Sequence, residues 1–167
     1  MDAKFVCGAS CLMINIKDSA LKLLSIRPRS VEELRGRLKL KKYAAGEIEE
    51  VLAMLQRQGL LDDEKFAKFF ANSRVYSRPA GKKQLAFELG RQGLSSELVS
   101  KTLENLKDYN EKETAGNLVR LRFQKMKGLT RQKKQARIYS FLKRRGFETD
   151  TIFAVMESLF KESEMPE

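Results

Sequence analysis

Residues 59–94 read GLLDDEKFAKFFANSRVYSRPAGKKQLAFELGRQGL, and this stretch decides the fold. Asp62 or Asp63 can cap a helix there, because a short carboxylate accepts the free amide hydrogens of a first helical turn. The stripe of that helix, apolar except for a serine, consists of Phe66, Phe69, Phe70 and Ser73. Pro79 and Gly81 end the helix and open a second one. The stretch therefore predicts two helices with a glycine turn at each end.

Six apolar positions of this pattern occur three times along the chain. The first set is Leu34, Leu38, Tyr43, Ile48, Leu52 and Leu55. The second set, 51 residues later (85 − 34), is Leu85, Leu89, Leu94, Val99, Leu103 and Leu106. The third set, a further 53 residues on (138 − 85), is Ile138, Leu142, Phe147, Ile152, Met156 and Leu159. Three registers of one pattern indicate three copies of one structural unit.

The predicted fold class is all-α, with three tandem three-helix (helix-turn-helix-like) units in an elongated, curved array. We expect a disordered N-terminal extension over 1–16, units over 17–61, 62–108 and 109–161, and a tail over 162–167. The helices are expected near 17–26, 30–40, 46–58, 62–77, 81–92, 95–106, 110–127, 130–145 and 148–161. Alternating β-branched residues typical of strands are absent from the sequence. Because about 45 residues bury too little surface to be stable alone, the units should stack.

The composition excludes several kinds of site. The chain has no histidine, which removes the commonest general base and metal ligand, and its two cysteines, Cys7 and Cys11, lack further zinc ligands. Gly81 and Lys82 do not form a phosphate-binding P-loop, because the other positions of that motif differ. We therefore expect no enzyme activity, no catalytic residue, no metal and no cofactor. No run is long enough to cross a membrane, and we expect a cytoplasmic monomer with reduced thiols.

The charge points to nucleic acid or to a partner bound to it. Lys and Arg outnumber Asp and Glu by 33 to 22, giving a net charge of +11, and residues 109–147 hold twelve bases and two acids. The second helix of the first unit starts with Ser30 and Glu33, a capping box. Its counterpart in the second unit starts with Lys82 and Lys83, and Lys133 and Lys134 occupy the same corner of the third unit. These cations oppose the helix dipole and could bind an anion at the free amides; the alternative is a solvated face.

Most aromatic side chains keep helical spacing with leucines and are expected in the core, with Tyr76 the most exposed. The predicted interface with nucleic acid, or with a partner bound to it, consists of basic residues of the second and third units. They are Arg74, Arg78, Lys82, Lys83, Arg91, Arg120, Arg122, Lys125, Lys127, Arg131, Lys133, Lys134, Arg137, Lys143, Arg144 and Arg145.

The sequence resembles the RecX regulators of the bacterial recombinase RecA. The motifs that carry the resemblance are GLLDDEKFAKFF, then Arg74, Gly81 and LAFELGRQGL, with SALKLLSIRPRSVEELRGRL before them and KRRGFETDTI after them. The resemblance covers roughly residues 17–160 and implies three tandem three-helix units. It also implies an inhibitor that binds in the groove of the RecA filament on single-stranded DNA and suppresses ATP hydrolysis and strand exchange. Direct binding to nucleic acid would be weak and largely non-specific.

An alternative is a helix-turn-helix protein that acts directly on duplex DNA. Residues 17–61 could form such a module, with the helix near 46–58 in the major groove. That helix carries Glu47, Glu49 and Glu50 against only Arg57, which suits a phosphate backbone badly.

Overall fold

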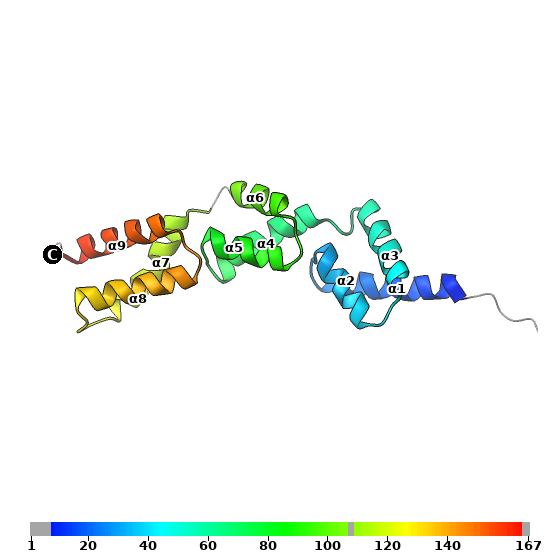
Figure 1. The fold of residues 1–167 in the computed structure, drawn as a ribbon, viewed down its shortest axis with the longest axis horizontal. Helices are drawn as coiled ribbons and strands as arrows, with labels where there is room; N and C mark the ends of the chain where they lie inside the picture. Colours follow the sequence, from blue (N-terminus) through cyan, green and yellow to red (C-terminus); the bar gives the residue numbers. More distant parts are fainter. Residues whose placement is uncertain (1–7, 107–108, 165–167) are drawn as a thin grey trace, which may run out of the picture.

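The computed structural model describes the backbone of residues 8–106 and 109–164, and the side chains of 16–106 and 109–161. Within those ranges the chain forms nine α-helices and no strand. Three groups of three helices follow one another along the long axis of the molecule (Figure 1). The predicted elongated array of three-helix units is confirmed.

The first unit consists of α1 (Gly8–Ile26), α2 (Val31–Leu40) and α3 (Ala45–Arg57). Its core is formed by the apolar stripes of the three helices, which face one another. The fully buried members are Ile16, Ala20, Leu34, Leu38, Ile48 and Leu55. The predicted core positions of this unit are therefore confirmed, apart from Tyr43, which is only partly buried and shares a hydrogen bond of 2.8 Å with Ser19.

The second unit consists of α4 (Asp63–Ser77), α5 (Lys82–Arg91) and α6 (Ser96–Glu104). Asp62 is the N-cap of α4 and accepts hydrogen bonds from the backbone amides of Glu64 and Lys65, as predicted. The core of this unit is the smallest of the three and contains Phe66, Ala67, Leu89, Leu94 and Val99.

The third unit consists of α7 (Glu111–Gln124), α8 (Arg131–Arg144) and α9 (Thr149–Glu164). α8 and α9 lie side by side at one end of the molecule, with α7 packed against both (Figure 1). The core contains Val119, Ile138, Leu142, Phe147 and Ile152, among others.

The predicted extension differs from the structure at its inner end. α1 begins at Gly8 and so includes residues 8–16 of that extension, and no proline or glycine follows Gly8 within the helix. Residues 1–7 lie outside the described residues. At the other end α9 continues to Glu164, into the predicted tail.

Adjacent units meet at the turns that follow the middle helices. Gly146, after α8, has φ +75° and lies against Gln84 of α5, while Gly93, after α5, has φ +82° and lies against Glu32 of α2. A Cβ at Gly146 would lie 2.5 Å from the backbone nitrogen of Gln84, and one at Gly93 would lie 2.3 Å from the Glu32 Cβ. Lys42, the corresponding residue after α2 (93 − 51), has φ 65° although it is not a glycine. Glycine is therefore required here for close approach between units as well as for backbone conformation.

Hydrogen bonds to backbone carbonyl oxygens join the second and third units. The Gly81 amide donates to the carbonyl oxygen of Arg145 over 2.8 Å, and Arg145 Nη1 donates to the carbonyl oxygen of Pro79 over 3.0 Å. The buried Tyr109 hydroxyl donates to the carbonyl oxygen of Ala80 over 2.5 Å. Burial raises the pKa of the Tyr109 phenol, with the nearby Glu111 carboxylate adding to the effect. Short, specific contacts therefore hold this junction together.

The aromatic residues follow the prediction only in part. Phe66 and Phe147 are buried, and Tyr76 is 79% exposed as predicted. Phe69 and Phe153, expected in the core, are 53% and 54% exposed. Helical spacing places Phe69 one position from Phe70, at the edge of the stripe, where the short helices of this small unit do not cover it.

Candidate functional site

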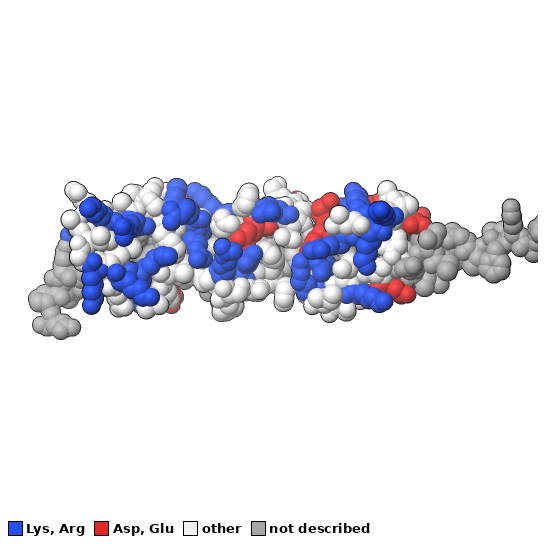
Figure 2. All heavy atoms as spheres, turned by 90° about the horizontal axis from the view of Figure 1, so that it is seen from below, with Lys and Arg blue, Asp and Glu red and all other residues white. Residues whose placement is uncertain are grey.

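The predicted interface residues lie on the last two units and mostly at the surface. Figure 2 shows lysine and arginine side chains along the whole length of one face of the molecule. Over the third unit the visible charged atoms are almost all basic, while acidic atoms lie among the bases over the other two units. The structure therefore concentrates one sign of charge at the C-terminal end of the array.

The lysine corner of α5 is not a free anion site. The Lys82 backbone amide, at the start of α5, donates to Glu111 Oε1 of α7 over 3.1 Å. Lys83 Nζ lies 2.9 Å from Glu148 Oε2, which raises the pKa of the Lys83 ammonium through that hydrogen bond and the charge of Glu148. Both interactions join the second unit to the third, so the interpretation of this corner as an open anion site is corrected: an acid of the same chain already occupies it.

The same contact occurs at the junction of the first two units. Asp63, the first residue of α4, accepts a hydrogen bond of 2.9 Å from the amide of Val31, the first residue of α2. Burial raises the pKa of the Asp63 carboxyl, which the Val31 amide partly offsets. Asp63 is therefore half-buried and structural, not the surface acid that its neighbour's capping role suggests. The acid at the start of each following unit binds the middle helix of the unit before it.

Several bases of the third unit lie over aromatic rings. The Arg122 guanidinium is 4.3 Å from the centre of the Phe141 ring, and Lys134 Nζ is 4.9 Å from the centre of the Phe123 ring. Such contacts restrain long side chains without removing their charge. The bases of this unit do not share one face, however. Arg120 lines a cavity of 470 Å³ between α7 and α9, away from the residues at the end of α8.

Five of the predicted arginines do come together at the junction of the second and third units. They line a cavity of 390 Å³ with Phe70, Ala80, Gln84, Glu88 and Gln92. The arginines are Arg74 and Arg78 from the end of α4, Arg91 from the end of α5, and Arg144 and Arg145 from the end of α8. We call this group the arginine pocket. Its one acid is Glu88, whose Oε2 lies 2.7 Å from Arg74 Nε in an ion pair.

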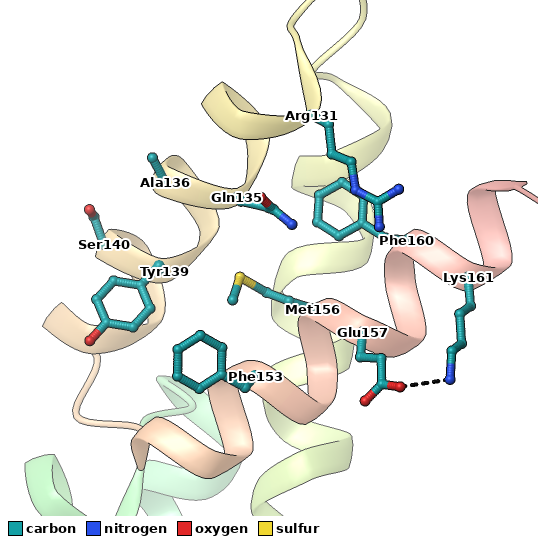
Figure 3. Close-up of a pocket in the computed structure, with 10 residues that line it drawn as sticks. All are labelled: Arg131, Gln135, Ala136, Tyr139, Ser140, Phe153, Met156, Glu157, Phe160 and Lys161. Carbon is teal, nitrogen blue, oxygen red and sulfur yellow. Dashed lines mark hydrogen bonds and ion pairs between the residues drawn. The ribbon is translucent and has the colours of Figure 1, made fainter.

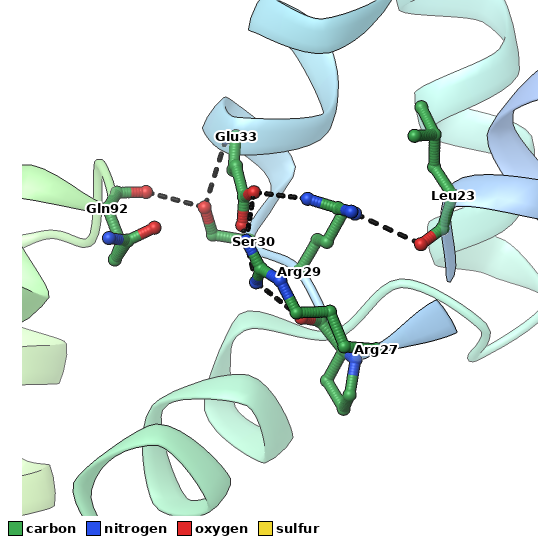
Figure 4. Close-up of polar contacts among 7 residues, drawn as sticks. Leu23, Arg27, Arg29, Ser30, Glu33 and Gln92 are labelled. Carbon is green, nitrogen blue, oxygen red and sulfur yellow. Dashed lines mark hydrogen bonds and ion pairs between the residues drawn. The ribbon is translucent and has the colours of Figure 1, made fainter. Parts of the chain in front are cut away.

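At the equivalent place, the junction of the first two units, a carboxylate of the same unit neutralises the arginines (Figure 4). Arg27 Nη2 lies 2.5 Å from Glu33 Oε1, and the 93% buried Arg29 binds the same carboxylate. Arg29 also donates from Nε to the carbonyl oxygen of Leu23 over 3.0 Å. The Ser30 hydroxyl caps α2 as predicted, by accepting from the Glu33 amide, and donates to the carbonyl oxygen of Gln92 in the next unit. The second half of the predicted capping box is absent, because the Glu33 carboxylate binds the two arginines instead.

An apolar groove of 760 Å³ lies between α8 and α9 (Figure 3). Tyr139, Phe153, Met156 and Phe160 line it, and the Tyr139 and Phe153 rings are 6.0 Å apart between centres. At its rim Lys161 Nζ pairs with Glu157 over 2.6 Å. An aliphatic or aromatic group of a partner would fit this groove, but nothing in it resembles an acid–base pair.

The described residues contain no group of three or more His, Cys, Asp or Glu side chains that could hold a metal ion. The two cysteines, expected to be reduced thiols, are not described in the structure. Cys7 lies outside the described residues, and Cys11 lies in the part of α1 where side chains are not described. Among the helices described, none is long and apolar enough to cross a bilayer.

Sequence reasoning did not find the ion-pair cluster of the first junction or its altered form at the second. The repeat register contained the signal, because Gln84 occupies the place of Glu33 (84 − 33 = 51). By itself, the change from Glu33 to Gln84 indicates a different helix cap. Because Arg78 occupies the place of Arg27, the same change also alters the charge of the junction.

The fold and the distribution of charge define this chain as a tandem helical-repeat protein with a basic surface and no recognisable catalytic centre among the described residues. Three family models match it in order: the first three-helix domain of RecX at residues 17–55, the second at 62–103 and the third at 110–156. The chain belongs to the RecX family.

Curated relatives agree with that membership. The chain is 34% identical over 142 residues to the regulatory protein RecX of Chlorobium limicola, covering 85% of this chain and 87% of the relative. It is 31% identical over 144 residues to that of Chlorobium phaeobacteroides, covering 86% and 93%. The crystal structure of RecX from Lactobacillus salivarius matches with a TM-score of 0.80 at 20% identity, over 90% of this chain and 97% of that one, which shows the shared fold.

Proposed function

We propose that this protein inhibits the RecA recombinase by binding in the groove of the RecA–DNA filament. Bound there, it suppresses ATP hydrolysis and strand exchange, acting as a regulator and not as a catalyst. It acts as a monomer in the cytoplasm, and its own affinity for nucleic acid is weak and largely non-specific.

Family membership across all three units is the observation that carries this proposal. The elongated shape supports it, because a row of three units offers one long surface to a repeating partner (Figure 1). The basic face supports it as well, since a protein that follows bound DNA benefits from cations that neutralise phosphates (Figure 2). The proposed contact residues are the sixteen predicted interface bases, with Lys82 and Lys83 contributing less because of their neighbours Glu111 and Glu148.

The charges on α3 do not favour the alternative, in which this helix would enter the major groove of duplex DNA. Glu49 of that helix pairs with Arg35 of α2 over 2.7 Å, which lowers the pKa of the Glu49 carboxyl, so this face keeps its acid ionised. An ionised acid on the helix that would enter the groove repels phosphates.

The test is binding to preformed RecA filaments on single-stranded DNA, measured by co-sedimentation for wild type and two charge-reversal variants. Lys133→Glu/Lys134→Glu reverses a basic part of the third unit, and Lys39→Glu/Lys41→Glu reverses the same charge on the first unit. We expect the third-unit variant to lose most of its filament binding, and the first-unit variant to retain binding within about twofold. Equal binding by all three proteins, with helical circular-dichroism signals unchanged, would count against the basic face as the contact.

A further inference from the structure

The two junctions of the array have the same construction but opposite electrostatic outcomes. At the first junction one internal carboxylate, Glu33, holds both Arg27 and Arg29. At the second junction Gln84 stands in the place of Glu33, and Arg78 stands in the place of Arg27. Ala80 stands in the place of Arg29, so the second junction lacks both the carboxylate and the buried arginine of the first, while the other arginine remains without its acid.

The arginine pocket therefore carries excess charge. Its five arginines face one carboxylate, Glu88, which leaves a formal charge of +4 (5 − 1). Within the described chain Arg78, Arg91 and Arg144 form no ion pair, and Gln84 donates from Nε2 to Glu88 Oε1 over 3.0 Å rather than pairing with a base. Like charges collected in one cavity repel one another, so the free pocket is poised to accept an anion.

The stacking of the guanidinium groups supports a built site. Arg74 lies over the Phe70 ring at 5.3 Å and Arg145 over the Phe141 ring at 5.5 Å, while Arg145 also donates to the Pro79 carbonyl. These contacts hold two planar groups in place before any ligand binds. A guanidinium presents a flat fork of donors that matches two oxygens of a phosphate, so preorganised arginines favour that anion.

We propose that the arginine pocket binds a phosphate of a single-stranded nucleic-acid backbone at the junction of the second and third units. The inference deepens the proposed function and rests on it, since the strand would be the DNA within the filament. The cavity volume of 390 Å³ is in the range of ligand sites and leaves room for a phosphodiester with part of its sugars.

A purely structural explanation is that these arginines complement the negative ends of α4, α5 and α8. One base near each helix end is enough for that effect. The pocket has five, drawn from the ends of three helices in two units. The surplus is what an external phosphate would neutralise.

The test uses the full-length protein and a fluorescein-labelled oligothymidylate, with binding followed by anisotropy over a salt series. Gln84→Glu restores the internal carboxylate of the first junction, and Arg78→Gln/Arg144→Gln removes two unpaired arginines. Gln56→Glu, on the exposed surface of α3, adds the same charge as Gln84→Glu away from the pocket and serves as the matched control.

Each phosphate contact to single-stranded DNA contributes about 0.7 to the slope of log K against log salt. The double variant should therefore abolish that one contact, lowering the slope by about 0.7 and weakening binding about fivefold at 0.1 M salt. Gln84→Glu should weaken it about fivefold, and Gln56→Glu less than twofold. Wild-type slopes and affinities in both pocket variants would overturn the proposal, as would wild-type binding weaker than about 10⁻⁴ M.

A second arm separates nucleic acid from free phosphate compounds. Inorganic tripolyphosphate competes in the same assay, and its affinity is measured for the same variants. If the variants lose tripolyphosphate but keep oligothymidylate, the assignment to a nucleic-acid backbone is wrong. The anisotropy assay contains no recombinase, so it tests the pocket independently of RecA. If the wild-type protein bound oligothymidylate through the pocket but did not inhibit RecA filaments, the proposed function would be refuted and the ligand of the pocket would stand.

Discussion

Gly81→Ala tests the close contact on which the junction of the last two units depends. Gly81 is the N-cap of α5 with φ −68°, a conformation that alanine adopts without strain. Only space opposes the substitution. A Cβ there would lie 2.2 Å from the Gly146 carbonyl oxygen and 2.4 Å from the Phe147 amide nitrogen. Because an ordinary contact is at least 3.4 Å, the two backbones would have to separate by about 1.2 Å (3.4 − 2.2).

That separation breaks the hydrogen bonds of the junction. The Gly81 amide to Arg145 carbonyl bond and the Arg145 to Pro79 bond are each worth about 1 kcal/mol, and overpacking adds about 1–3 kcal/mol. The expected loss in the free energy of unfolding is therefore about 3–5 kcal/mol. For a chain of this size it lowers Tm by roughly 10 °C. Thermal and denaturant unfolding followed by circular dichroism measure both quantities.

Gly90→Ala is the matched control on the same helix. Gly90 lies inside α5, and a Cβ there would meet no atom within 4 Å. It should raise the free energy of unfolding by about 0.5–1 kcal/mol, since alanine loses less backbone entropy in a helix. If Gly81→Ala proved as harmless as Gly90→Ala, the units would not meet as closely as described.

The remaining predictions concern single polar contacts, each measured as a change in the free energy of unfolding by denaturant. Glu33→Gln leaves the buried Arg29 without its carboxylate and should cost about 3 kcal/mol, whereas Glu32→Gln, 54% exposed, should cost under about 0.5 kcal/mol. Tyr109→Phe removes the buried hydroxyl that binds the Ala80 carbonyl and should cost about 1–2 kcal/mol, with a smaller loss contradicting that contact. Asp62→Ala removes the N-cap of α4 and should cost about 1 kcal/mol at pH 7. The Lys65 backbone amide holds the pKa of Asp62 below its usual value, so this contribution is present above about pH 4 and should disappear as the pH falls further. Asp62→Asn, which still caps but does not titrate, should lack that extra loss in acid.

The sequence predicted the architecture because the repeat records it directly. Leu34, Leu85 and Ile138 occupy equivalent positions in three copies, and all three are buried. Caps were equally readable, since Asp62 needs only its own next three residues to act. Local rules were sufficient wherever the partners of a residue are near it in the chain.

Contacts between units could not be read in the same way. Nothing local tells that Asp63 binds the start of α2 or that Arg145 reaches Pro79, 66 residues away in the chain. The lysine corner shows the consequence: the helix start at Lys82 looked open because its partner, Glu111, lies in another unit. A basic surface could be predicted from the composition. Which lysines and arginines line a pocket, stack on rings or form ion pairs at a junction depends on the relative positions of the units.

Inhibition of RecA by this protein can be measured directly as ATP hydrolysis by RecA on single-stranded DNA while this protein is titrated in. We expect the wild-type protein to inhibit hydrolysis at a dose well below one copy per recombinase subunit. The Lys133→Glu/Lys134→Glu variant should inhibit less. The dose also distinguishes capping of filament ends from coating along their length. Unchanged hydrolysis at every dose, with tight binding to bare duplex DNA, would contradict the account and favour a protein that acts on DNA directly.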